Sequence, residues 1–129
     1  LKGIMTARGA EKALEAGASG IVVSNHGGRV LDHCPATAEV LPEIADAVGG
    51  RMTIFVDGAV RSGMDIFKAL ALGADAVLIG RPFVTSIYGG GEEGVKLYVQ
   101  KLKAELADTM RMCGAHSLAE IDRSMIYRG

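Results

Sequence analysis

The sequence predicts an α/β protein built on a parallel sheet. Three short apolar stretches read as strands, at residues 20–24 (GIVVS), 52–57 (MTIFVD) and 76–80 (AVLIG). They are continuously apolar rather than alternating, which is typical of parallel strands covered on both faces. Helical patterns lie between them, and a regular alternation of strand and helix builds a parallel sheet.

The remaining elements follow in the same order along the chain. Leu1 and Lys2 read as the end of a further strand. Apolar residues at helical spacing predict helices over residues 6–16, 36–48, 62–72 and 92–112, and a short one over 117–123. In the helix over 92–112 we expect Val95, Val99, Leu102 and Leu106 inward, and Lys96, Lys101, Lys103 and Glu105 outward. Ser117 is the expected N-cap of the last helix, with Glu120 three residues on.

An internal sequence repeat bears on the fold class. The segment ALEAGASGIVVSN at residues 13–25 resembles ALALGADAVLIGR at 69–81. A (β/α) barrel shows such echoes, and so does an open doubly wound sheet. A whole barrel needs roughly 250 residues, so these 129 residues would supply about half of one. Because the chain begins LKGI without a methionine, we expect a fragment.

Composition excludes several classes of function. The net charge is −1, from 14 basic and 15 acidic residues, which argues against a nucleic-acid or membrane-surface partner held by bulk charge. We expect no membrane span and no signal peptide. Cys34 and Cys113 lack CxxC or zinc-type spacing, so we expect free thiols, a cytoplasmic location and no bound metal.

Polar residues follow each predicted strand. Lys2 follows the first, Ser24, Asn25 and His26 the second, Asp57 to Arg61 the third, and Gly80 and Arg81 the last. Ligands of parallel α/β proteins gather at the carboxyl ends of strands. The loops VDGAVRSG and IGRP combine small residues with an arginine, so backbone N–H groups and a helix N-terminus would approach an anion that Arg61 and Arg81 bind. Tight turns with surface arginines are the alternative.

His26 is the candidate general base. It follows a strand directly and precedes Gly27, Gly28 and Arg29. A histidine near its ordinary pKa suits proton abstraction, and a nearby guanidinium suits a carboxylate substrate. His33 and His116 lack such a setting, and we expect them to be incidental.

The blocks GIVVSNHGGRVLDHCPAT, LPEIADAVGGR and FVDGAVRSGMDIFKALALGADAVLIGRP resemble, in order and spacing, the carboxyl-terminal half of the FMN-dependent α-hydroxy-acid oxidases and dehydrogenases. That family includes glycolate oxidase, lactate oxidase, mandelate dehydrogenase and flavocytochrome b2. The likeness covers nearly the whole chain. It implies that residues 1–129 are one unit, strands five to eight of a TIM barrel.

The resemblance also implies roles for the strand-end residues. His26 would match the active-site base and Arg29 the arginine that binds the substrate carboxylate. Lys2 would lie near the flavin ring, and Ser24 would contact the flavin. The segments that hold the ribityl chain and phosphate would be Asp57, Gly58, Ala59, Val60, Arg61, Gly80 and Arg81. The implied reaction is the FMN-dependent oxidation of a small L-2-hydroxy acid, lactate-like or glycolate-like, to the 2-oxo acid, in a homo-oligomer.

Some positions depart from the family pattern. Ala59 stands where a second glycine is usual, Ser62 where many members carry an arginine, and Val30 where glutamine is common. Other contacts come from a first half that this chain lacks. The alternatives are a non-catalytic half-barrel that binds FMN or another phosphate compound, a structural fragment that associates through its open sheet edges, and an unrelated flavodoxin-like open sheet.

Overall fold

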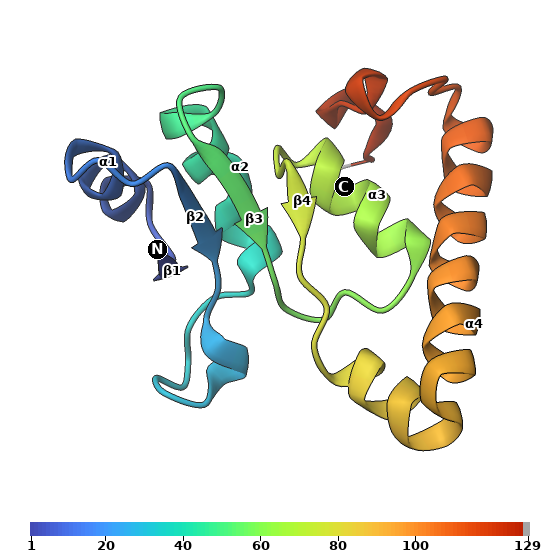
Figure 1. The fold of residues 1–129 in the computed structure, drawn as a ribbon. Coiled ribbons are helices and arrows are strands. Elements are labelled where there is room, and N and C mark those ends of the chain that lie inside the picture. Colours follow the sequence, from blue (N-terminus) through green and yellow to red (C-terminus); the bar gives the residue numbers. More distant parts are fainter. Residues whose placement is uncertain (128–129) are drawn as a thin grey trace.

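The computed structural model describes residues 1–127, which form one four-stranded parallel sheet with helices along it (Figure 1). The strands are β1 (Lys2–Ile4), β2 (Gly20–Val23), β3 (Thr53–Val56) and β4 (Ala76–Val77), and they lie side by side in chain order. Gly20 to Val23 pair in unbroken register with Thr53 to Val56. The pairing of β1 with β2 is irregular between Lys2 and Ile4.

Three helices connect the strands, and their bounds agree with the sequence pattern to within a residue at either end. They are α1 (Ala7–Glu15), α2 (Thr37–Val48) and α3 (Gly63–Ala71). Thr6 caps α1 through its side chain, which accepts a hydrogen bond from Gly9 N–H, and Ser62 caps α3 in the same way. These caps explain why the helices begin where the sequence predicted.

The final helix differs from the prediction. It is α4 (Arg81–Cys113), which begins directly after β4 and contains one non-helical residue, Gly91, with φ 54° and ψ −136°. The two limbs, residues 81–90 and 92–113, meet in the bend at the lower right of Figure 1. The prediction covered only the second limb. Val99, expected inward, is 46% exposed, and Glu105, expected outward, hydrogen-bonds to Gly63.

The last predicted helix is replaced by two short 3₁₀ turns, Leu118–Glu120 and Arg123–Met125. Ser117 makes no side-chain cap. Its hydroxyl instead lies 3.2 Å from the Glu120 carboxylate, which also accepts a hydrogen bond from His116 N–H. These turns pack Ala115 and Ile121 against Phe67 and Ala71 of α3.

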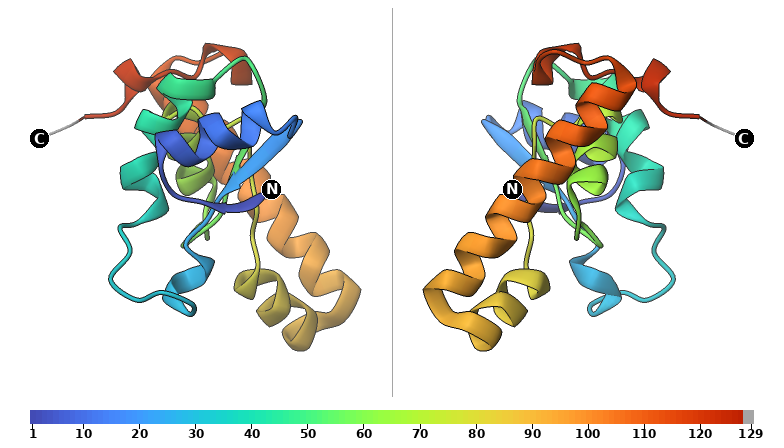
Figure 2. Two further views of the ribbon diagram at one scale, coloured as in Figure 1. Left: turned by 90° about the vertical axis from the view of Figure 1, so that its left-hand side faces the viewer. Right: turned by 90° about the vertical axis from the view of Figure 1, so that its right-hand side faces the viewer.

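The main core lies on one side of the sheet. Ile21 and Val23 of β2 and Ile54 and Val56 of β3 are buried there, together with Leu41, Ile44 and Val48 of α2. Helices α1, α2 and α3 gather on that side in the turned views of Figure 2. Val22 and Phe55, which alternate with the buried strand residues, are only partly buried. Within residues 1–127 the second face of the strands is therefore only partly covered, where the apolar pattern indicated cover on both faces.

β4 is also shorter than predicted. It spans Ala76–Val77 rather than residues 76–80, and Leu78 beyond it is 41% exposed. Gly80 serves as the N-cap of α4. The chain thus leaves the sheet early and places residues 78–81 along the edge where the strands end.

Candidate active site

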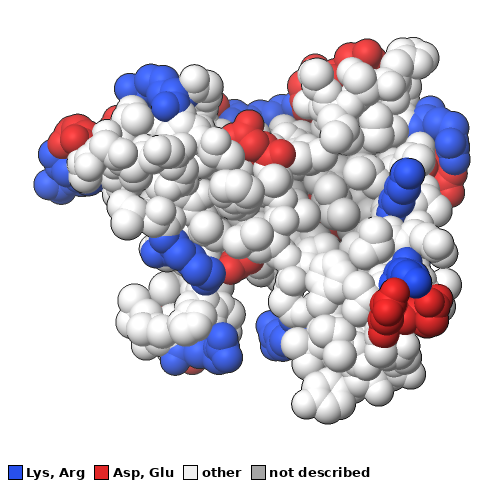
Figure 3. Space-filling model, viewed as in Figure 1, with Lys and Arg blue, Asp and Glu red and all other residues white. Residues whose placement is uncertain are grey.

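A cavity of about 800 Å³ opens at the carboxyl ends of the strands. It lies between the loop after β2 and the first limb of α4, the two lobes at the bottom of Figure 3, where Lys and Arg side chains gather. The structure brings together there all but one of the residues singled out from the sequence. Its lining includes Lys2, His26, Arg29, Asp57, Gly58, Ala59, Val60, Arg61, Gly80 and Arg81.

The loop after β2 turns sharply so that His26 and Arg29 reach the cavity. His26, Gly27 and Gly28 have φ of 56°, 68° and 71° in succession, a left-handed backbone that glycine adopts without strain. Asn25 fixes the turn, because its Oδ1 accepts from Gly27 N–H at 3.0 Å and its Nδ2 donates to the Pro35 carbonyl at 3.2 Å. The glycines therefore follow His26 because the turn requires them.

His26 and Arg29 lie close together in this turn. Arg29 Nε donates to the His26 carbonyl at 3.3 Å, which leaves the two terminal guanidinium nitrogens for another partner. Both side chains are exposed and line the cavity. A planar guanidinium with two outward N–H groups suits a carboxylate. His33, by contrast, does not line the cavity, although it too has a positive φ of 61°.

Lys2 is the first residue of β1 and not, as predicted, the end of a strand, but its side chain links the first three strands at this edge. Its Nζ lies 3.1 Å from Asp57 Oδ2 and 2.7 Å from Ser24 Oγ. Thr37 donates to the Asp57 carbonyl at 2.6 Å, so Asp57 is held from α2 as well. Lys2 is thereby kept at the cavity wall as a fixed positive charge.

Ser24 is the one predicted site residue that does not line the cavity. It is 2% exposed, and its Oγ accepts from Lys2 Nζ and, at 3.2 Å, from His26 N–H. It lies behind the wall and connects the lysine to the histidine. Its predicted contact with a flavin stays a prediction.

The two predicted anion loops meet in the cavity, but the backbone N–H groups of the loop before α3 are used differently from the expectation. The guanidinium groups of Arg61 and Arg81 line it and, among residues 1–127, neither makes a hydrogen bond or ion pair. The N–H groups at the start of α3, however, are occupied: those of Arg61 and Ser62 donate to Asp65, and that of Gly63 donates to Glu105. The expectation that this helix N-terminus offers backbone N–H groups to an anion is therefore wrong for these three groups.

Hydrogen bonding also sets the charge of these carboxyl groups. Burial raises the pKa of Asp65, but the Ser62 hydroxyl, the N–H groups of Arg61 and Ser62 and the charge of Lys68 outweigh it, so the pKa lies below its ordinary value. Lys101 and the Gly63 N–H hold the pKa of Glu105 below its ordinary value. Both groups are thus negative at the N-terminus of α3, where the helix dipole favours negative charge.

Several residues of the site were not found from the sequence. Leu78, Pro82, Thr85, Ser86 and Tyr98 also line the cavity. The first limb of α4 has apolar residues at helical spacing, Phe83, Val84 and Ile87, which could have predicted a helix there. Tyr98 carries no such local signal, because it reaches the cavity only through the bend of α4.

The cavity suits a phosphate-bearing cofactor. Its volume falls within the range of small-molecule sites, about 300–1,000 Å³. Two guanidinium groups without protein partners are the donors that phosphate prefers. Among residues 1–127 no cluster of three or more His, Cys, Asp or Glu side chains could hold a metal ion, and no helix there is both long and apolar enough to cross a bilayer.

Comparison with known proteins supports this interpretation. The family model of the FMN-dependent dehydrogenases matches residues 1–128. A peroxisomal (S)-2-hydroxyacid oxidase of Arabidopsis thaliana is 51% identical over 126 residues, which cover 98% of this chain and 35% of that protein. The glycolate oxidase of Spinacia oleracea is 52% identical, with 98% of this chain and 34% of that protein covered.

A solved structure agrees with the sequence matches. A mandelate oxidase with benzoyl-formic acid superimposes with a TM-score of 0.92 and 46% identity over 95% of this chain and 37% of its own. The present chain thus spans about a third of the length of these relatives. It belongs to the family of FMN-dependent dehydrogenases.

Proposed function

We propose that this chain is the carboxyl-terminal half of a TIM barrel, strands five to eight, in an FMN-dependent enzyme that oxidises small L-2-hydroxy acids. The observation that carries the proposal is one cavity lined by His26, Arg29, Lys2, Arg61 and Arg81 together. The half-covered sheet supports the barrel: Val22 and Phe55 face away from the helices, as residues inside a barrel do. The other half would cover them.

Two parts of the cavity would hold FMN. Arg61 and Arg81, with the backbone of residues 58–60 and Gly80, fit the phosphate and ribityl chain, and Lys2 fits the flavin ring. Ala59, where the family usually has glycine, lines this part with a φ of 58°. When bound, FMN accepts the two electrons that the hydroxy acid loses.

The substrate would lie between His26 and Arg29. The Arg29 guanidinium binds the carboxylate through two parallel hydrogen bonds, which fixes the hydroxyl-bearing carbon. Oxidation of a 2-hydroxy acid to a 2-oxo acid removes two electrons and two protons. The His26 imidazole takes one of those protons as general base, and the other would leave with the two electrons to the bound flavin. The link from Arg29 Nε to the His26 carbonyl keeps the two groups in one turn.

The names of the relatives support this class of substrate, since they are a 2-hydroxyacid oxidase, a glycolate oxidase and a mandelate oxidase. Glycolate-like and lactate-like acids are the substrates that we propose. The cytoplasmic location and a homo-oligomer stay predictions; the Arabidopsis relative is named peroxisomal, which makes the peroxisome the alternative compartment.

The test uses the longer protein that carries these residues. Added FMN should lose its fluorescence on binding, and anaerobic glycolate or lactate should then bleach the flavin. His26→Ala should bind FMN but not bleach. His33→Ala is the matched control, because His33 is exposed outside the cavity, and it should bleach normally.

Quenching without bleaching in the unsubstituted protein would favour a non-catalytic FMN-binding unit instead. Absence of both would contradict the proposal, as would full bleaching by His26→Ala.

A further inference from the structure

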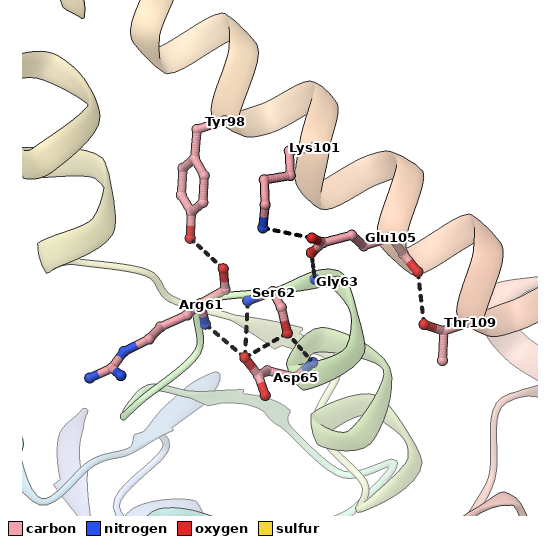
Figure 4. Close-up of polar contacts among 8 residues, drawn as sticks. All are labelled: Arg61, Ser62, Gly63, Asp65, Tyr98, Lys101, Glu105 and Thr109. Atoms are coloured by element: carbon pink, nitrogen blue, oxygen red, sulfur yellow. Dashed lines mark hydrogen bonds and ion pairs between the residues drawn. The ribbon is translucent and has the colours of Figure 1, made fainter. Parts of the chain in front are cut away.

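The backbone of Arg61 is held from two sides. Its N–H donates to Asp65 Oδ2 at 3.0 Å, and its carbonyl accepts from the Tyr98 hydroxyl at 3.0 Å. Asp65 belongs to α3 and Tyr98 to the second limb of α4, so two separate elements fix the backbone of one residue (Figure 4). Burial raises the pKa of Tyr98, which keeps the phenol protonated as a donor.

In the same turn most N–H groups are already used. Arg61, Ser62 and Gly63 all donate to carboxylates, as described above, and Asp65 N–H donates to Ser62 Oγ at 3.2 Å. The charged group that the turn offers to an anion is the Arg61 guanidinium, which Figure 4 shows extended away from α4. How well that group binds depends on how firmly the peptide beneath it is held.

The Tyr98 ring is held in place by the ring of Phe83. Their ring centroids are 5.2 Å apart and the rings are nearly perpendicular, at 77°, an edge-to-face pair. Phe83 lies on the first limb of α4, two residues after Arg81. One tyrosine thus contacts both the turn that carries Arg61 and the limb that begins with Arg81.

We propose that Tyr98 is a positioning residue that sets Arg61 relative to Arg81, so that both guanidinium groups bind the same phosphate. The inference rests on the proposed function, in which that phosphate belongs to FMN. Without the phenol hydroxyl the Arg61 carbonyl loses its partner on α4. The turn then moves more freely, and binding must order it at a cost in affinity.

The test compares FMN with riboflavin, which lacks the phosphate. In the longer protein Tyr98→Phe keeps the ring pair and removes only the hydroxyl. FMN should bind about 3–10-fold more weakly, the range for one neutral hydrogen bond, and riboflavin affinity should not change. Tyr88→Phe is the matched control, because Tyr88 lies on the same helix and is 89% exposed; it should change neither affinity.

A double substitution makes the test specific. In an Arg61→Ala background Tyr98→Phe should cause no further loss of FMN affinity, because the group that it positions is gone. Equal losses for FMN and riboflavin, a loss that persists without Arg61, or no loss at all would overturn the inference. Failure of the unsubstituted protein to bind FMN would instead overturn the proposed function.

Discussion

Gly63 allows α3 and α4 to cross at backbone contact, and its replacement by alanine tests that packing. An added Cβ would lie 2.2 Å from Leu106 N and 2.6 Å from Glu105 C, where ordinary contact begins at 3.4 Å. Both obstacles are backbone atoms, so the helices must separate by about 1 Å. Overpacking of this kind costs about 1–3 kcal/mol. Because no side chain can rotate away, we expect Gly63→Ala to lose about 2–3 kcal/mol.

Urea unfolding measures this loss in the free energy of unfolding directly, provided that the dependence on urea concentration (the m-value) is unchanged. Gly89→Ala is the control on α4, because nothing lies within 4 Å of its added Cβ; removing a glycine from a helix should there gain about 0.5–1 kcal/mol. A Gly63→Ala protein that loses less than about 0.5 kcal/mol would refute the reasoning. It would mean that the two helices separate without cost.

Three further predictions follow from the site. Arg29→Lys replaces a two-pronged donor by a point charge, so KM for the hydroxy acid should rise about tenfold; an unchanged KM would count against carboxylate binding. Ala59 has a left-handed backbone with φ 58°, and replacing it by glycine should relieve about 1–2 kcal/mol of strain at an entropy cost of about 0.5–1 kcal/mol. The free energy of unfolding of Ala59→Gly should therefore rise by about 0.5–1 kcal/mol. A fall would argue against strain at this residue. Asp65 has a pKa lowered from 3.8, so its carboxylate stabilises the fold above that value and the contribution is lost as pH falls through the folded-state pKa. Stability should therefore fall more between about pH 5 and pH 2 in the unsubstituted protein than in Asp65→Asn; equal falls would exclude that role.

The sequence predicted α1, α2 and α3 well because the signals that start a helix lie in adjacent residues. Ser62 caps α3 from the adjacent position and Thr6 caps α1 likewise. The run Gly89, Gly90, Gly91 is typical of a loop, and it hid the first limb of α4, although only Gly91 leaves the helical conformation. Glycine lowers helix propensity without forbidding a helix whose other residues pack.

The strand-end residues were predicted as a group because parallel strands end at one edge. What could not be predicted was the use of the Gly63 N–H group. Glu105 reaches Gly63 from 42 residues away in sequence, and such a contact depends on how α4 bends. The same holds for the partly covered second face of the sheet. An apolar strand has the same sequence pattern whether the residues that cover it belong to this chain or lie outside it.

The buried hydroxyl of Ser24 accepts two hydrogen bonds, one from Lys2 Nζ and one from His26 N–H. Any replacement there would shift the lysine's position and loosen the histidine turn in the same step. Natural variation at positions 2 and 24 should therefore be correlated, and an engineer who wishes to alter the lysine or the histidine turn alone must leave residue 24 untouched.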